Sequence, residues 1–518
     1  MPNDDEKVSL RCWIGVFGTM LGAFMAVLDI QITNSSLRDI TGGIGATIDE
    51  GSWISTSYLI GEIVTIPLTA WFSKIFGVRW YLLANVVLFL GFSMLCGIAP
   101  NLTTMIFLRA GQGFTGGVMI PMSFTVLLQT LPKSKQPIGF ALFGMTATLA
   151  PAIGPTIGGF LTDSFGWPMV FYVNLIPGAL MLLAIAYAID PQPFDFSFFE
   201  NGDWWGIGTM AIGLGSLIAM LEEGQRKDWF GSTFICWCAA LAAVFIPIFF
   251  LIEWYREEPF VNLRLLHHRN LWAGSVVTFG MGFALYGSVY LLPLYLQSVQ
   301  GYDAYETGLT MLWIGLPQLL IFPFVPFLMK RFDLRALVCF GVIVFGISCY
   351  MNISMSPAYS GPDFFWPNIV RSLGQPFTIV PLSALATSTL APKESADGSA
   401  IFNIARNIGG SVGIALISTI ITRREQFHDL RIGESVTAYS LATQNRLHTI
   451  AASFVAKGFG PATAMKQAYA SIKGVMSKNA YVMATNDAFM FVGICLTLGG
   501  MIVWICKKPD LKGAAPAH

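Results

Sequence analysis

One apolar stretch, residues 146–161, most constrains what this chain can fold into. It reads TATLAPAIGPTIGGFL, and its helix breakers are Pro151, Gly154, Pro155, Gly158 and Gly159. In water such a run would form a loop, because Pro removes a backbone donor and Gly loses much entropy on ordering. The stretch, however, ends an uncharged run that begins at Ile138, and a bilayer offers no water to unpaired backbone groups. We therefore predict a membrane helix whose irregularities are covered by neighbouring helices.

Small residues recur on one face of this predicted helix. Ala150, Gly154 and Gly158 stand at every fourth position, and such spacing lets another helix approach backbone to backbone. Two interpretations remain open. The face is either a tight helix contact with no further role, or a stiff, kinked gasket between two moving bundles.

The composition agrees with a membrane protein that crosses the bilayer many times. The chain is 54% hydrophobic and 12% charged, against about 25% charged in soluble domains. About 20 apolar residues span the hydrocarbon core. Fourteen ranges meet this requirement: 13–33, 53–73, 80–99, 102–130, 138–161, 169–189, 204–221, 233–252, 271–297, 307–329, 335–354, 364–390, 398–421 and 486–506.

Positive charge supports this span count and orients the chain. With both termini inside, sixteen Lys and Arg residues fall on the inner side, and only Arg38, Arg226 and Lys227 fall on short outer loops. The exception is the outer loop at about 422–485, which is basic, but long loops escape the rule. We expect this loop to be helical in part, and to serve either as a passive connector or as a docking element.

An internal repeat divides the chain. Residues 67–79 and 323–335 align at an offset of 256 (323 − 67), with their basic residues in register, and residues 111–115 resemble 374–378. Both copies lie on the same side of the membrane, so the halves are parallel repeats. The predicted fold is an all-α membrane protein with these parts: 1–190, a six-helix bundle; 191–262, a linker and two-helix insert; 263–518, a second six-helix bundle with the outer loop.

Two carboxylates lie inside predicted spans, where charges are rare and mark transport pathways. Asp29 lies near the outer end of the first span, and Glu62 lies in the middle of the second. Burial disfavours a charged carboxylate, so each is a candidate for proton coupling. The alternative for Asp29 is a fixed ion pair with Arg109, and the alternative for Glu62 is a polar contact between helices.

Other polar groups in the spans are candidates for the substrate cavity. They are Gln31, Asn34, Gln112, Gln375, Arg406 and Asn407. Arg109 would act in proton coupling, by favouring the charged form of a nearby carboxylate or by presenting a fork to substrate. The arginines, Arg371 included, would otherwise reach to a membrane surface along their apolar stems.

Four basic residues on short inner loops are candidates for gating: Lys74, Arg79, Lys330 and Arg335. They would latch one span end to another, or only satisfy the topology rule. The numerous Phe and Met residues would contact lipid or form an adaptable apolar pocket.

Other functional classes find no support in the sequence. The net charge is zero, so no nucleic-acid partner is expected. The chain has no nucleotide loop, no metal-ligand spacing and no nucleophile–base set, which argues against a cofactor, a metal and an enzyme.

Motifs along most of the chain resemble one known family. They are Leu28-Asp29 with Asn34; Trp53, Thr56-Ser57-Tyr58, Pro67-Leu68-Thr69, Trp71, Lys74 and Gly77; Arg109, Gln112-Gly113 and Pro121; Gly154-Pro155, Gly158-Gly159, Asp163 and Trp167; and Asn403, Arg406, Gly410-Ser411 and Gly413. This pattern resembles the major facilitator superfamily, specifically its fourteen-span drug:proton antiporter branch. The Gly-Pro-x-x-Gly-Gly run resembles the antiporter motif of that branch, which favours the gasket interpretation.

The resemblance implies a mechanism and a location. Two halves would rock around a central cavity in the bacterial inner membrane, and substrate would leave as a proton enters. Asp29 and Arg109 would belong to the coupling machinery, while Glu62 and Arg406 would face the cavity. Relatives in Gram-negative bacteria work with a periplasmic membrane-fusion adaptor and a TolC-type outer-membrane channel, which the 422–485 loop would contact.

Three functional hypotheses follow. The first is a proton-driven multidrug exporter of amphipathic or hydrophobic compounds. The second is a dedicated exporter of a single metabolite, siderophore or fatty acid. The third, a membrane enzyme or a non-transporting sensor, has no motif in its favour.

Overall fold

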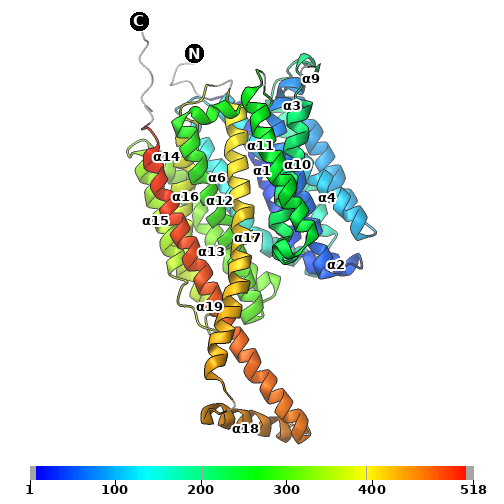
Figure 1. Cartoon of the computed structure of the whole chain (residues 1–518). Coiled ribbons are helices and arrows are strands. Elements are labelled where there is room, and N and C mark those ends of the chain that lie inside the picture. The colour runs from blue at the N-terminus through cyan, green and yellow to red at the C-terminus, as the bar shows by residue number, and fades with distance from the viewer. Residues whose placement is uncertain (1–7, 201, 258, 392–393, 438, 509–518) are drawn as a thin grey trace.

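The computed structural model describes residues 8–200, 202–257, 259–391, 394–437 and 439–508. Throughout these residues the chain forms helices, turns and connecting segments, and no strand (Figure 1). Ten of the described helices are long and apolar enough to cross a membrane. The predicted all-α membrane class is therefore confirmed. Both chain termini, predicted on the inner side, lie outside the described residues.

The first part of the chain forms a helical bundle. Its helices are α1 (Leu10–Ser35), α2 (Leu37–Gly43), α3 (Ile48–Cys96), α4 (Leu102–Gly116), α5 (Met119–Thr130), α6 (Gln136–Phe165), α7 (Met169–Tyr172) and α8 (Leu175–Ala188). Capping side chains start several of them; for example, Asn101 accepts a hydrogen bond from the Thr104 amide at 2.9 Å. Helix α1 packs against α5, α6 and α8, and α3 packs along α4.

Helix α3 consists of two helical arms that meet at a kink. The range 53–73 and most of the range 80–99, predicted as two spans joined by a loop, lie in these two arms, and the backbone leaves the helical conformation at Gly77. Gly77 has φ 70° and ψ 151°, a conformation that costs little only without a Cβ. Lys74 and Arg79, predicted on a loop, therefore lie on the two helical arms that meet at this glycine.

The middle of the chain forms the insert. It consists of α9 (Ser197–Glu200), α10 (Trp204–Glu223), the short 3₁₀ turn η1 (Trp229–Gly231) and α11 (Thr233–Tyr255). Helix α10 packs against α11, and also against α3 and α17. The insert therefore contacts both the first and the last parts of the chain.

The last part of the chain forms a second bundle. Its main helices are α12 (Arg269–Tyr295), α13 (Ala304–Ile321), α14 (Val325–Met329), α15 (Leu334–Tyr350), α16 (Phe365–Thr387), α17 (Ser395–Ser435), α18 (Leu441–Ala456) and α19 (Pro461–Met501). Short helical turns flank them: η2 (Leu263–His267), η3 (Leu296–Gln300), η4 (Phe322–Phe324), η5 (Gly361–Phe364) and η7 (Ile502–Ile505).

The predicted outer loop at 422–485 is helical throughout most of its described length. Helices α17 and α19 continue beyond the bundle, and α18 joins their far ends (Figure 1). Arg424 Nε and His428 Nε2 both contact Asp487 Oδ2, at 2.6 and 2.7 Å, where the two helices leave the bundle. We refer to this element, residues 422–485, as the helical extension.

The predicted repeat has a matching set of contacts in the two bundles. Arg79 Nη1 donates to the carbonyl of Ile189 at 3.2 Å, and Arg335 Nη1 donates to the carbonyl of Cys506 at 3.3 Å. Each carbonyl follows the last helix of its bundle, where the helix dipole favours a cation. Lys330 is exposed near the start of α15. In each bundle the arginine therefore links the helix that carries the motif to the end of the last helix of the same bundle.

Candidate transport cavity and buried charge network

A cavity of about 400 Å³ lies between the two bundles and α10. Its wall is predominantly apolar, with polar groups from α1, α3, α10, α12 and α17. Asn34 and Arg226 are exposed at the end of the bundle from which the helical extension projects, so the cavity opens toward that end. Of the predicted cavity residues, Gln31, Asn34 and Asn407 line it, as does Glu62.

Glu62 lies deep in the cavity wall and connects the two bundles. Its side chain is 5% exposed, and its Oε1 accepts a hydrogen bond from Asn407 Nδ2 at 3.2 Å. Arg406, next to Asn407 on α17, interacts electrostatically with the Glu62 carboxyl. Arg406 is buried against the Phe143 ring at 5.6 Å and does not line the cavity, which differs from the predicted placement.

The opposite end of the bundle is closed by contacts between α3, α5 and α17. Lys74 Nζ lies 3.5 Å from Asp397 Oδ2 across the two bundles. Deeper in, Ser399 Oγ donates to the Pro121 carbonyl at 3.0 Å, and the Phe124 and Phe402 rings stack at 5.7 Å. Together these contacts separate the cavity from the end that carries the 191–203 linker.

Helix α6 packs closely against a helix of each bundle. A Cβ on Gly158 would meet Ser35 Oγ and lie 3.0 Å from the Ile32 carbonyl of α1, and a Cβ on Gly154 would meet Gln31. On the other side, a Cβ on Gly159 would lie 3.1 Å from Ala304 Cβ of α13. The predicted close approach of a second helix is present, and α6 forms part of the seam between the bundles. Pro151 and Pro155 lie within α6 without ending it.

Asp29 and Arg109 form an ion pair that is fully shielded from solvent. Arg109 Nη1 lies 2.6 Å from Asp29 Oδ2, and both side chains are 0% exposed. The second carboxylate oxygen, Oδ1, accepts from Gln112 Nε2 at 3.0 Å and from Asn174 Nδ2 at 2.6 Å. The Arg109 guanidinium also lies over the Tyr58 ring, 4.4 Å from its centre. In this conformation Asp29 adopts the ion-paired alternative left open by the sequence.

Two predicted cavity residues lie away from the cavity. Gln112 belongs to the Asp29 network, where its Oε1 also accepts from Arg109 Nη1 at 2.8 Å. Gln375 accepts from Gln318 Nε2 at 2.6 Å in the second bundle, and both glutamines have 0–1% exposed side chains. Their burial follows from the helix faces on which they lie, which the linear sequence does not reveal.

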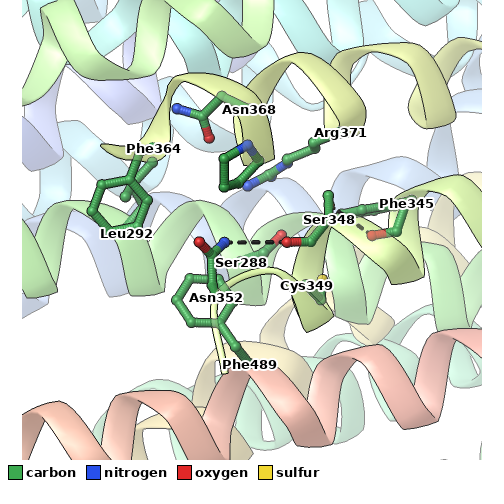
Figure 2. A pocket seen from close by; sticks show the side chains of 11 residues that line it. Ser288, Leu292, Phe345, Ser348, Cys349, Asn352, Phe364, Asn368, Arg371 and Phe489 are labelled. Atoms are coloured by element: carbon green, nitrogen blue, oxygen red, sulfur yellow. Dashed lines mark hydrogen bonds between the residues drawn. The ribbon is translucent and has the colours of Figure 1, made fainter. Parts of the chain in front are cut away.

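Arg371 occupies a corresponding interior position in the second bundle. Figure 2 shows its guanidinium beside Ser348 and Asn352, around a small cavity of about 10 Å³ that has room for one water molecule. Its Nη2 donates to the Leu285 carbonyl at 3.4 Å, and the Phe345 ring lies 5.3 Å away. Among the described residues no carboxylate lies within ion-pair distance of Arg371, so the two bundles differ in charge at this depth.

The site contains three residues that the sequence analysis did not single out. Asn174 lies inside the predicted span 169–189, Asp397 immediately precedes the span 398–421, and Glu222 immediately follows the span 204–221. The only sequence signal that could have identified them was their position as polar residues within or at the edge of a predicted span. Spacing alone could not relate these residues to partners far away in the chain.

The arrangement is that of a membrane transporter: two helical bundles enclose a cavity that reaches one end of the molecule and is closed at the other. Residues 19–414 match the family model of the Major Facilitator Superfamily, and the chain belongs to this family. It is accordingly a transporter and not an enzyme. The human organic anion transporter MFSD10 has the same fold, with a TM-score of 0.58 over 95% of this chain and 99% of that chain at 11% identity.

Curated relatives point to a particular branch. The chain is 36% identical to the colistin resistance protein EmrB of Acinetobacter baumannii, over 85% of this chain and 86% of the relative. It is 30% identical to the multidrug export protein EmrB of Escherichia coli K12, over 94% of both chains. It is also 30% identical to the fatty acid resistance protein FarB of Neisseria gonorrhoeae, over 95% of this chain and 96% of the relative.

Proposed function

We propose that the protein is a proton-coupled exporter of amphipathic or hydrophobic drugs across the bacterial inner membrane. The proposal includes fourteen spans, with both termini cytoplasmic. It also includes the division into bundles 1–190 and 263–518 and an insert at 191–262. The helical extension then projects into the periplasm, and the structure represents a state open to the periplasm.

The observation that carries the proposal is the placement of Glu62. Its carboxyl group lines a cavity that is open at one end, and it bonds to Asn407 of the other bundle. A proton arriving from the open end neutralises Glu62 and weakens its attraction to Arg406. The charge state of one side chain thereby changes the contact between α3 and α17.

The rest of the cycle follows from the contacts at the two ends. Closing the cavity at the periplasmic end requires the cytoplasmic end, held by Lys74 and Asp397, to open. Proton release to the cytoplasm restores the charge on Glu62, and cargo enters. Helix α6 stays packed on α1 and α13 and keeps the seam tight. Asp29 and Arg109 would hold the first bundle rigid, or exchange protons if rocking exposes them. The cycle needs no cofactor, because the proton gradient supplies the energy.

The helical extension is the proposed contact for a periplasmic membrane-fusion adaptor, and through it a TolC-type outer-membrane channel. Exposed apolar side chains on it include Leu430, Tyr439 and Leu441, at 71%, 97% and 71% exposure. Large exposed apolar groups outside the bundle favour a protein partner. Deleting α18 would then reduce drug resistance in cells while leaving transport by the purified protein intact.

Transport by inverted vesicles tests the proposed function. Export should accelerate when a pH gradient is imposed, and Glu62→Gln should abolish this acceleration. Equal rates with and without the gradient would refute proton coupling.

A dedicated exporter of one metabolite, siderophore or fatty acid is the second candidate. The similarity to FarB, named for fatty acid resistance, is the observation in its favour. Resistance profiles with chemically unlike compounds separate the two candidates: protection against a single chemical class would favour the dedicated exporter.

A further inference from the structure

The insert forms part of the cavity wall. Helix α10 packs between α3 of the first bundle and α17 of the second. Ile218, Leu221 and Glu222 of α10, followed by Gln225 and Arg226, line the cavity. The insert is therefore in a position to contact cargo as well as to join the two bundles.

Two adjacent acids at the end of α10 have different surroundings. Glu223 is 1% exposed and accepts a hydrogen bond from Thr56 Oγ1 of α3 at 2.8 Å. Glu222 lines the cavity, and its carboxyl group accepts a hydrogen bond from the side chain of Ser411 of α17. The Oε1 atom of Glu222 is buried and has no hydrogen-bond partner.

A buried carboxylate oxygen without a donor is costly, so it favours a proton or a cationic ligand. Tyr290 and Tyr286 line the same wall as Glu222. Aromatic faces attract cations. Arg226 follows one turn later but is exposed, so solvent screens its charge. Glu62, the other cavity carboxylate, already has Asn407 and Arg406 as partners.

We propose that Glu222 binds the positively charged group of cationic amphipathic cargo, with Tyr290 beside it and the apolar cavity wall holding the rest of the molecule. The biological role of this cation binding rests on the proposed export function, whereas the test of the binding itself does not require export. The insert would then select cargo by charge, independently of the proton carried by Glu62.

Binding of two ions of matched shape and opposite charge tests the proposal. Tetraphenylphosphonium and tetraphenylborate are titrated into the purified full-length protein in detergent, without a gradient, for wild type and Glu222→Gln. We expect Glu222→Gln to weaken tetraphenylphosphonium binding about tenfold, which corresponds to about 1.4 kcal/mol. Binding of tetraphenylborate should stay unchanged or become tighter, and Glu222→Asp should keep most of the affinity for the cation.

The matched control is Glu223→Gln, the same chemical change one residue further on and outside the cavity lining. It should leave the ratio of the two affinities unchanged. Unaltered cation binding by Glu222→Gln, an equal loss for both ions, or a wild type that does not bind the cation would each overturn the proposal. Absence of gradient-driven export together with Glu222-dependent cation binding would refute only the proposed function.

Discussion

Replacing Asp29 with Asn should destabilise the first bundle strongly, because Arg109 would keep its charge with no carboxylate in reach. Both side chains are 0% exposed, and the pair is 2.6 Å apart. Removing one partner of such a buried pair costs about 3–5 kcal/mol. With an unfolding entropy of about 2.1 cal/mol/K per residue, a chain of 518 residues loses roughly 1 °C per kcal/mol. The melting temperature should therefore fall by about 3–5 °C.

The double variant Asp29→Asn with Arg109→Gln tests whether the lost stability comes from the unpaired charge of Arg109. Removing both charges leaves no uncompensated ion, so it should recover most of the lost stability. Melting in detergent, followed by intrinsic fluorescence, measures both variants. A single variant as stable as the wild type, or a double variant no better than the single one, would refute the ion-pair argument. Transport by the stable double variant then decides between the two roles, since a purely structural pair would leave proton-driven export in place.

Three further predictions concern the seam, the closed end and the repeat. Gly158→Ala should lower the free energy of unfolding by about 1–3 kcal/mol and slow transport, because the added methyl group forces α1 away. The control Gly91→Ala, at a helix position with open space, should change neither quantity. Melting experiments and transport assays measure both variants. Lys74→Asp should raise cysteine labelling near the closed end about fivefold, and adding Asp397→Lys should reverse the increase. The hydrogen bond from the neighbouring arginine lowers the pKa of Asp333. The ionised Asp333 side chain thus stabilises the fold above about pH 4, and this contribution is lost as the pH falls through the lowered pKa. Asp333→Asn should therefore lower the free energy of unfolding by up to about 1 kcal/mol at pH 7 and by less at pH 3, which melting experiments across pH measure.

The close packing of α6 illustrates what could be predicted of the fold. Glycines at every fourth position in an uncharged run admit few structures in a bilayer, so a close helix contact followed from spacing alone. The partner did not follow. Gly158 meets α1 and Gly159 meets α13 because of how the bundles lie against each other, and that depends on packing across the whole chain.

In the candidate site, too, the sequence predicted the key residues but not their partners. Asp29, Glu62 and Arg109 were identifiable because ionisable groups inside apolar runs are rare and costly. Their partners were not, since Asn174 and Asn407 lie 145 and 345 residues away from the carboxylates they contact. Glu222 was overlooked because it lies at the edge of a predicted span, where a charge usually means only that the membrane has ended.

The sequence by itself determined the class of protein, an all-helical membrane transporter, because hydrophobicity, charge placement and glycine spacing are local properties that decide whether a segment is stable in a bilayer. Only the tertiary structure decided which charges neutralise each other and which face the cavity. Those outcomes depend on the rotation of each helix about its axis and on its neighbours.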